Sequence, residues 1–407
     1  MELIAIIYFL YMFISFYFLV FIILLYLKNK NQMFDSPAMT RNYSISVLIP
    51  AYNEEKTILE TIKSVYNIDY DNITEVIVIN DGSKDNTLEI LKKVLHDYKG
   101  LKVLNKQNSG KADSLNKALK FCSGELIVVV DADSYPSRDS FKKMVGYFDD
   151  TRVGGVTAAC IPRNRETFLE KLQVMEYKVI AFTRKLLEYV DSIYVIPGTA
   201  GMYRAEAIKK SGFDLKNITE DIEATWHLVH DGWKIKMSLE TSIGTEIPNK
   251  IKPWYKQRRR WALGGVQCIN KYKGTFMRHG MLGAFILPFF VLGLFLGLIG
   301  ISIFIYLFIS RIMSYYLFAK YSIAIDSPMV TMNDLYLTPS VLNYFGLMMF
   351  FLYFLFTLFV LAMMKDRLFE KQSFFNLIFY MTIYLLVYPI VLIVGCWHFI
   401  RGKNIWR

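Results

Sequence analysis

Four stretches of the chain are almost free of charged residues, and each is longer than the ~20 residues needed to cross a bilayer core. They cover residues 4–27, 281–309, 341–364 and 374–400. The pattern predicts an N-terminal transmembrane anchor over 1–30, a globular domain over 42–275, a multi-span transmembrane block over 281–400 and a basic tail over 401–407. The first stretch lacks a basic leading region and a small-residue cleavage site, so we expect a retained anchor and not a signal peptide.

Within the globular domain, short runs rich in Val and Ile alternate with segments of helical period. The runs predict strands at Ile45–Pro50, Glu75–Ile79, Leu101–Asn105 and Leu126–Val130. Apolar residues over 85–97 line one face of a helix, and Asn53 and Ser83 stand where helix N-caps would. The alternation of strand and helix indicates an α/β fold with a parallel-rich sheet and crossover helices.

Three aspartates each follow a predicted strand, and ligands of such sheets bind beyond the carboxyl ends of the strands. We therefore expect Asp81, Asp131 and Asp133 to converge on one crevice. Two carboxylates two residues apart at a strand end can hold a hard divalent cation, although they also suit a solvated turn. Asn80–Ser83 has a similar second interpretation, because Gly and Ser are favourable residues in a turn that leads into a helix.

Two further motifs open predicted helices. Gly110-Lys111-Ala112 places free backbone amides and a lysine where a pyrophosphate would bind, although a solvated lysine explains it equally well. Thr219-Glu220-Asp221 begins a helix that runs to His230. Acids in a first turn usually serve the helix dipole, and this is the default interpretation of the motif taken alone.

The segment from Gln257 to Trp261 is the most distinctive, because three arginines stand beside Trp254, Tyr255 and Trp261. Such a mixture predicts an amphipathic helix near 252–273 that lies at the membrane interface. It also suits stacking on a sugar ring and pairing with a diphosphate.

The net charge of +11 is concentrated beside the predicted spans. Lys28 and Lys30 follow the first span, and Arg258–Arg260 precede the second. Positive charge beside spans marks the cytoplasmic side, so the globular domain should face the cytoplasm and no nucleic-acid partner is needed. The four cysteines form no CxxC pair and fit a reducing compartment.

Together these motifs resemble the processive family-two glycosyltransferases, which include cellulose, chitin and hyaluronan synthases. The resemblance runs from about Ser44 to Gly265, and within the family it is greatest to the bacterial poly-N-acetylglucosamine synthases. The motifs that carry it are Pro50–Glu54, Asn80–Ser83, Gly110–Ala112, Asp131–Asp133, Thr219–Asp221 and Gln257–Trp261. It implies a nucleotide-sugar-binding domain of GT-A-like fold inserted between transmembrane helices.

The resemblance also implies a role for each matching residue. In the donor site, Ala51 and Glu54 would line the nucleoside pocket, and Asp81 would contact the uridine. Lys111 would approach the diphosphate, and Asp131 would help to bind the nucleotide sugar.

The remaining implied roles concern the metal, the base and the acceptor. Asp133 would hold Mg²⁺ or Mn²⁺ through the diphosphate, and Asp221 would be the general base. The acceptor end and the diphosphate would be held by Glu220, Gln257, Arg260 and Trp261.

The chemistry predicts single displacement by an acceptor hydroxyl, which needs a carboxylate to take its proton. An α-linked UDP-sugar would then give a β-linked extracellular polysaccharide, and UDP-N-acetylglucosamine is the expected donor. The expected partners are this donor, the growing polysaccharide, membrane lipid and a small membrane subunit. Three alternatives stay open: transfer of one sugar to a lipid or lipid-phosphate carrier, a catalytically inactive nucleotide-binding membrane sensor, and a transporter with a soluble insert.

The number of spans is the least determined feature. Both the loop Lys365–Lys371 and the tail 401–407 are basic, and one span between them cannot leave both in the cytoplasm. If residues 281–325 form two short spans that meet near Gly300, the tail lies inside. We therefore favour five spans over four, with a cytoplasmic tail.

Overall fold

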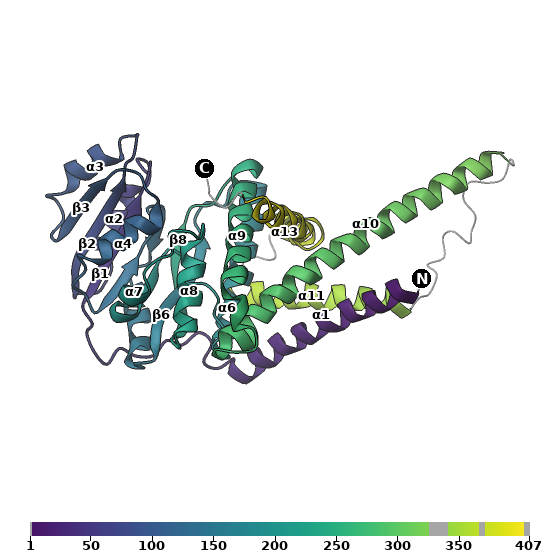
Figure 1. Ribbon diagram of the computed structural model, residues 1–407, viewed down its shortest axis with the longest axis horizontal. Helices are drawn as coiled ribbons and strands as arrows, with labels where there is room; N and C mark the ends of the chain where they lie inside the picture. Colours follow the sequence, from purple (N-terminus) through teal and green to yellow (C-terminus); the bar gives the residue numbers. More distant parts are fainter. Residues whose placement is uncertain (1, 325–340, 366–370, 403–407) are drawn as a thin grey trace.

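A computed structural model describes residues 2–324, 341–365 and 371–402 of the protein. An α/β domain lies at one end of the molecule and long helices extend from its other side (Figure 1). The strands of the domain are β1 Ile45–Ala51, β2 Ile73–Asp81, β3 Leu101–Lys106, β4 Leu126–Val129, β5 Ser134–Pro136, β6 Val153–Pro162, β7 Gly201–Arg204 and β8 Lys234–Thr245. They form an eight-stranded sheet in the order β3-β2-β1-β4-β7-β6-β8-β5.

The sheet is parallel where the sequence predicted strands. β1 pairs in parallel with β2 and β4, and β2 pairs in parallel with β3. β7 then runs antiparallel to both β4 and β6. The predicted parallel-rich α/β fold is confirmed, and the carboxyl ends of β1, β2 and β4 lie at one edge.

Helices cover both faces of this sheet. Those of the α/β domain are α2 Ile58–Tyr66, α3 Thr87–Val94, α4 Lys111–Leu119, α5 Ser140–Val145, α6 Phe168–Glu188, α7 Ala205–Ser211 and α8 Glu220–His230. The predicted helix starts at Gly110 and Thr219 are confirmed, because these residues are the N-caps of α4 and α8.

The predicted caps at Asn53 and Ser83 are wrong. α2 begins after Thr57 and α3 after Asn86, so both helices start three or more residues later than predicted. The Asn53 amide instead donates to Ser83 Oγ over 2.9 Å, and the Lys84 amide donates to Asn53 Oδ1 over 2.8 Å. Local hydrogen bonding between two loops therefore replaces capping, and it joins the ends of β1 and β2.

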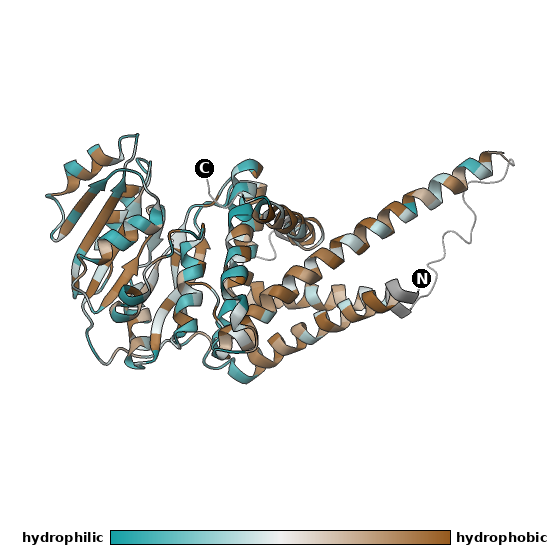
Figure 2. Cartoon of the chain, viewed as in Figure 1, coloured by the Kyte–Doolittle hydropathy of each residue, from teal (hydrophilic) through white to brown (hydrophobic). Residues whose placement is uncertain are grey.

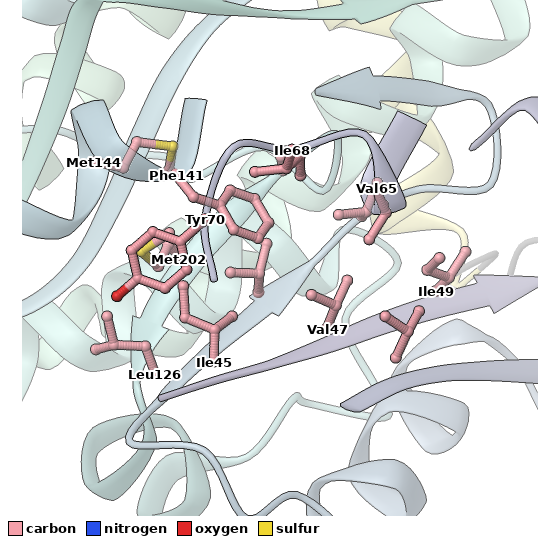
Figure 3. Close-up of a cluster of buried hydrophobic side chains, with 14 of the residues drawn as sticks. Ile45, Val47, Ile49, Val65, Ile68, Tyr70, Leu126, Phe141, Met144 and Met202 are labelled. Carbon is pink, nitrogen blue, oxygen red and sulfur yellow. The ribbon is translucent and has the colours of Figure 1, made fainter. Parts of the chain in front are cut away.

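The core is centred on β1, whose seven residues are all buried. On one face of the sheet, Ile45, Val47 and Ile49 pack against a cluster that includes Val65 of α2 and Phe141 of α5 (Figure 3). A strand buried on both faces lacks polar alternation. The same holds for β4, because its four residues are also buried.

The remaining helices are apolar, and all but the nine-residue α12 are long (Figure 2). They are α1 Glu2–Asn29, α10 Leu287–Ala324, α11 Val341–Met363, α12 Lys371–Phe379 and α13 Leu385–Ile400, and π-helical turns at Leu282–Ile286 and Tyr380–Tyr384 precede α10 and α13. Within the described residues, four helical segments are long and apolar enough to cross a membrane: 5–29, 282–324, 344–363 and 374–400.

The predicted break near Gly300 is wrong. The helix passes unbroken through Gly300, where the Tyr11 side chain of α1 fits closely: a Cβ on this glycine would lie 3.2 Å from the Tyr11 hydroxyl. Glycine here serves close helix packing and does not end the helix. Three of the six basic residues used for the five-span count, Arg367, Lys403 and Arg407, lie outside the described residues.

A helix between the domain and the membrane helices, α9 Ile251–Tyr272, corresponds to the predicted amphipathic segment. It lies across the directions of α1 and α10, where the two halves of the molecule meet (Figure 1). The loop before α8 is attached to it: the Ile218 amide donates to Gln267 Oε1 over 3.0 Å, and Asn217 Nδ2 donates to Cys268 Sγ over 3.1 Å. α9 thus holds the N-terminus of α8.

The close contact between Gly264 of α9 and Thr219, the N-cap of α8, leads to a stability prediction. A Cβ on Gly264 would overlap the Thr219 hydroxyl, whereas nothing lies within 4 Å of a Cβ on Gly265. We expect Gly264→Ala to lower the thermal unfolding midpoint of the purified protein, because overpacking costs about 1–3 kcal/mol. The adjacent Gly265→Ala is the control, and the higher helix propensity of alanine should leave its midpoint equal or higher. Equal midpoints for the two variants would contradict the close crossing.

Candidate active site

Lys111 lies at the centre of the polar residues at the carboxyl edge of the sheet. It is the first residue of α4, and its Nζ lies 2.6 Å from Asp131 Oδ1 and 2.7 Å from Glu220 Oε1. Asp131 follows β4, and its amide donates to the Gly198 carbonyl over 3.0 Å. The structure therefore brings together three motifs that are spread over more than one hundred residues of the sequence.

The charges of this cluster support one another. Burial alone would lower the pKa of Lys111, but the neighbouring carboxylates of Asp131, Glu220 and Asp221 outweigh it and raise that pKa. Burial would likewise raise the pKa of Glu220, yet the Lys111 and Arg260 cations hold it below its usual value. Lys111 is thus a fixed cation, and Glu220 is a fixed anion.

Asp221 is adjacent to this ion pair but differs in its protonation. Burial and then the Glu220 carboxylate raise the pKa of Asp221 to about 6, while Lys111 and Arg260 oppose the shift. One of its oxygens accepts a 2.9 Å hydrogen bond from the Ile222 amide. A carboxylate with a pKa near 6 is ionised at neutral pH and can accept a proton there.

Asp133 and Glu54 add negative charge next to Asp131. Burial, together with the Asp131 and Glu54 carboxylates, raises the pKa of Asp133 to about 7. Burial also raises the pKa of Glu54, with Asp131 contributing. A divalent cation at Asp133 would relieve this repulsion, so the residues fit such an ion. The described residues contain no group of three His, Cys, Asp or Glu that could hold a metal, so phosphate oxygens would have to supply the remaining ligands.

Asp81, at the carboxyl end of β2, orders the loop that leads to Lys111. Its carboxylate accepts hydrogen bonds from the Ser109 amide over 2.9 Å and the Gly110 amide over 2.8 Å, and it forms an ion pair with Lys106. These contacts hold the loop that ends at Lys111. Asp81 is thus connected to Asp131 through this loop and Lys111, whereas its convergence with Asp131 and Asp133 on one crevice stays a prediction. Ala51, the last residue of β1, is buried and pairs in the sheet with Asn80, the residue before Asp81.

The sequence analysis missed Gly198. A Cβ at this position would lie 2.5 Å from Lys111 Nζ and 2.9 Å from Asp131 Oδ2, so only glycine leaves room for the ion pair. Its sequence signal was the Pro197-Gly198 pair, which indicates an ordinary turn.

A cavity of about 1480 Å³ lies in front of Lys111 and Glu220. It is lined by residues 108–113 at the start of α4, by residues 214–218 and by Arg260 of α9, and Phe399 near the end of α13 also borders it. Ligand pockets are usually ~300–1,000 Å³, so this space can hold a nucleotide sugar.

The Gln257–Trp261 segment divides its residues between two environments. Arg260 lines the cavity and acts on the Asp221 charge. Gln257 Oε1 accepts a 2.8 Å hydrogen bond from Arg258 Nη1, and the Trp261 ring centroid lies 4.1 Å from the Arg258 guanidinium. Arg258, which the sequence analysis did not single out, is buried beneath both.

The arrangement can be compared with known proteins. The family model described as glycosyl transferase family 2 matches residues 46–212, which include Lys111, Asp131 and Asp133. A mannosyltransferase from Pyrobaculum calidifontis, solved in complex with GDP-Man and Mn²⁺, superposes with a TM-score of 0.62. The superposition covers 98% of each chain at 19% sequence identity, so it supports the fold.

Two similar relatives are poly-β-1,6-N-acetyl-D-glucosamine synthases. The one from Staphylococcus epidermidis is 32% identical over 271 residues, which are 65% of this chain and 63% of the relative. The one from Staphylococcus aureus strain COL is 31% identical over 248 residues, which are 60% of each. The chain thus spans less than two thirds of the length of these curated relatives. Residues 46–212 therefore form a glycosyl transferase family 2 domain of GT-A-like fold, and apolar helices long enough to cross a membrane flank this domain.

Proposed function

We propose that this glycosyltransferase polymerises N-acetylglucosamine from UDP-N-acetylglucosamine into a β-linked extracellular polysaccharide. The observation that carries the proposal is the Lys111 bridge between Asp131 and Glu220, with Asp221 beside it and a large cavity in front. The names of the similar relatives support the choice of sugar.

In the proposed reaction, the donor diphosphate lies against Lys111 and the free amides at the start of α4. The nucleoside occupies the side of Ala51 and Glu54, near the loop that Asp81 anchors. Because Asp81 already holds two backbone amides, its contact with the uridine would use the carboxylate edge left free by them. Asp131 orients the sugar and keeps Lys111 in place.

Asp221 is the proposed general base. An acceptor hydroxyl in the cavity would transfer its proton to Asp221 as its oxygen attacks the anomeric carbon, and the bond to UDP breaks. Arg260 and Lys111 stabilise the negative charge that develops on the leaving diphosphate. One displacement inverts the anomeric configuration, so an α-linked donor gives a β-linked product.

A divalent cation, Mg²⁺ or Mn²⁺, is part of the proposal and would be held by Asp133. When bound, it would neutralise the diphosphate during bond breakage. The structurally similar mannosyltransferase was solved with Mn²⁺ bound, and this supports a divalent cation as part of the proposal.

We assign acceptor binding to Gln257 and Trp261. We also infer that the domain faces the cytoplasm and that the product leaves through the apolar helices. Lys28 at the end of α1 and the basic α9 place positive charge on the side of the domain. A small membrane subunit is retained as an expected partner.

The experiment that tests the function incubates purified protein with one UDP-sugar at a time. UDP-N-acetylglucosamine should give UDP release together with a product ladder, whereas UDP-glucose and UDP-galactose should give little of either. A single added sugar on a lipid would favour the lipid-carrier alternative, and no UDP release from any donor would favour the inactive sensor.

The role of Asp221 predicts that Asp221→Asn lowers polymer synthesis by about 10²–10⁴-fold, because the amide cannot accept the proton. UDP affinity should stay within about twofold of wild type, since the base contacts the acceptor and not the nucleotide. Equilibrium binding of UDP and radiolabelled polymer yield measure the two effects. A tenfold loss of UDP affinity with residual synthesis would refute the assignment.

The same residue predicts the pH dependence of the wild-type enzyme. Asp221 must be ionised to act as a base, so activity should fall as the pH drops through about 6. Asp133, with a pKa of about 7 before the cation binds, could give a similar limb. Plots of rate against pH at several Mg²⁺ concentrations separate the two residues. If Asp221 causes the loss of activity at low pH, the pH at which it occurs should not change with Mg²⁺. A loss of activity whose midpoint pH shifts with every increase in Mg²⁺ would be assigned to Asp133.

The proposed metal site predicts that excess chelator abolishes UDP release. Asp133→Ala should also remove the rise in unfolding temperature that Mn²⁺ and UDP together give the wild type, because the linkage depends on binding to the folded state. Asp97→Ala removes an exposed carboxylate just after α3 and is the matched control. It should keep both the sensitivity to chelator and the rise in unfolding temperature. Full turnover in excess chelator would exclude the cation.

A further inference from the structure

A buried ion pair between α6 and α9 has no part in the proposed chemistry. Arg258 of α9 donates through Nη2 to Glu176 Oε2 of α6 over 2.7 Å. Only 1% of the Arg258 side chain and 4% of the Glu176 side chain are exposed. A charge pair buried so deeply holds α6 and α9 in one relative position.

The last membrane helix joins this pair through two tyrosines. Tyr384 donates to Glu176 Oε2 over 2.6 Å, and Arg258 Nε donates to the Tyr388 hydroxyl over 2.9 Å. The Trp254 indole of α9 donates to the Tyr384 hydroxyl over 2.9 Å. Tyr384 ends the π-helical turn before α13, and such turns occur frequently at functional sites.

Arg258 also contacts both proposed acceptor residues. Its Nη1 donates to Gln257 Oε1 over 2.8 Å, and its guanidinium lies 4.1 Å from the Trp261 ring centroid. One side chain therefore links Gln257 and Trp261 to α6 and to the last membrane helix.

Stability is a poor explanation for this arrangement. Buried ion pairs are often no more stabilising than apolar residues of the same volume, because desolvation offsets their attraction. Glu176 uses one oxygen for both hydrogen bonds, and its Oε1 is buried without a partner among the described residues. A carboxylate with half of its bonding capacity unused adds a further cost.

We propose that Glu176 and Arg258 are positioning residues that fix Gln257 and Trp261 against the last membrane helix and thereby set the length of the polymer. The inference rests on the proposed function. A polymerising enzyme must hold the chain end while the chain advances by one sugar, so the acceptor residues and the membrane path must keep a constant separation. If Trp261 loses this support, the chain dissociates after fewer additions. Reaction of the donor with water should continue, because other elements hold Lys111 and Asp131.

The central experiment replaces the pair without leaving a lone buried charge. The double variant Glu176→Leu with Arg258→Met keeps the volume apolar, and we expect its unfolding midpoint to match or exceed that of the wild type. Mean product length should fall on the order of tenfold, whereas UDP release by donor hydrolysis should stay within about twofold. Lys256→Met removes an exposed cation from the same helix and is the control; it should keep the wild-type product length.

Two conservative variants keep the test informative if the double variant does not fold. Arg258→Lys retains the charge opposite Glu176 but loses the planar donors that reach Gln257 and Tyr388, so products should still be short. Tyr384→Phe removes one hydroxyl bonded to Glu176 and should shorten products less. A merely structural charge pair would be rescued by lysine.

The outcomes separate the inference from the function on which it rests. Wild-type product lengths in folded double, Arg258→Lys and Tyr384→Phe variants would overturn the positioning role. A parallel loss of hydrolysis and extension in these variants would also overturn it. If the wild-type protein makes no polymer from any UDP-sugar, the proposed function fails and the positioning role fails with it.

Discussion

The Lys111 ammonium group is the interaction on which the polar edge of the domain depends. Five carboxylates stand close to one another there: Glu54, Asp131, Asp133, Glu220 and Asp221. Partly buried anions repel strongly, and Lys111 offsets this by pairing with two of them at 2.6 and 2.7 Å. Its position is in turn fixed by the Asp81-anchored loop and by the absence of a side chain at Gly198. The environments of Glu220 and Asp221 then diverge, and one stays ionised while the other titrates near neutrality.

The helix α9 connects this chemistry to the membrane part of the molecule. One of its faces holds the start of α8, through Gly264 and Gln267, and so places Asp221. Another turn of the same helix contributes Arg260 to the cavity. Its N-terminal half packs on α6 and the last membrane helix through Trp254 and Arg258. α9 thus contacts the start of the helix that carries the proposed base, borders the cavity and carries the proposed acceptor residues.

The errors of the sequence analysis share a physical cause. Asn53 and Ser83 are good capping residues by type, but their partners lie in each other's loop, and no local pattern shows that. Gly300 breaks helices by propensity, yet here it allows Tyr11 to pack closely. Arg258 was one of a run of basic residues before a predicted span, and the structure makes it a buried partner of Glu176, which lies 82 residues earlier.

The sequence alone determined the parts of the protein that depend on local chemistry. Apolar period and length gave the strands β1 to β4, the start of α4 and α8, and the membrane helices, because backbone hydrogen bonding and burial act over a few residues. The order of six short motifs also indicated the glycosyl transferase family 2 domain. Only the tertiary structure decided which charges meet. Protonation and orientation depend on distance and burial between residues such as Lys111 and Glu220, and these are set by how strands and helices pack and not by any pattern along the chain.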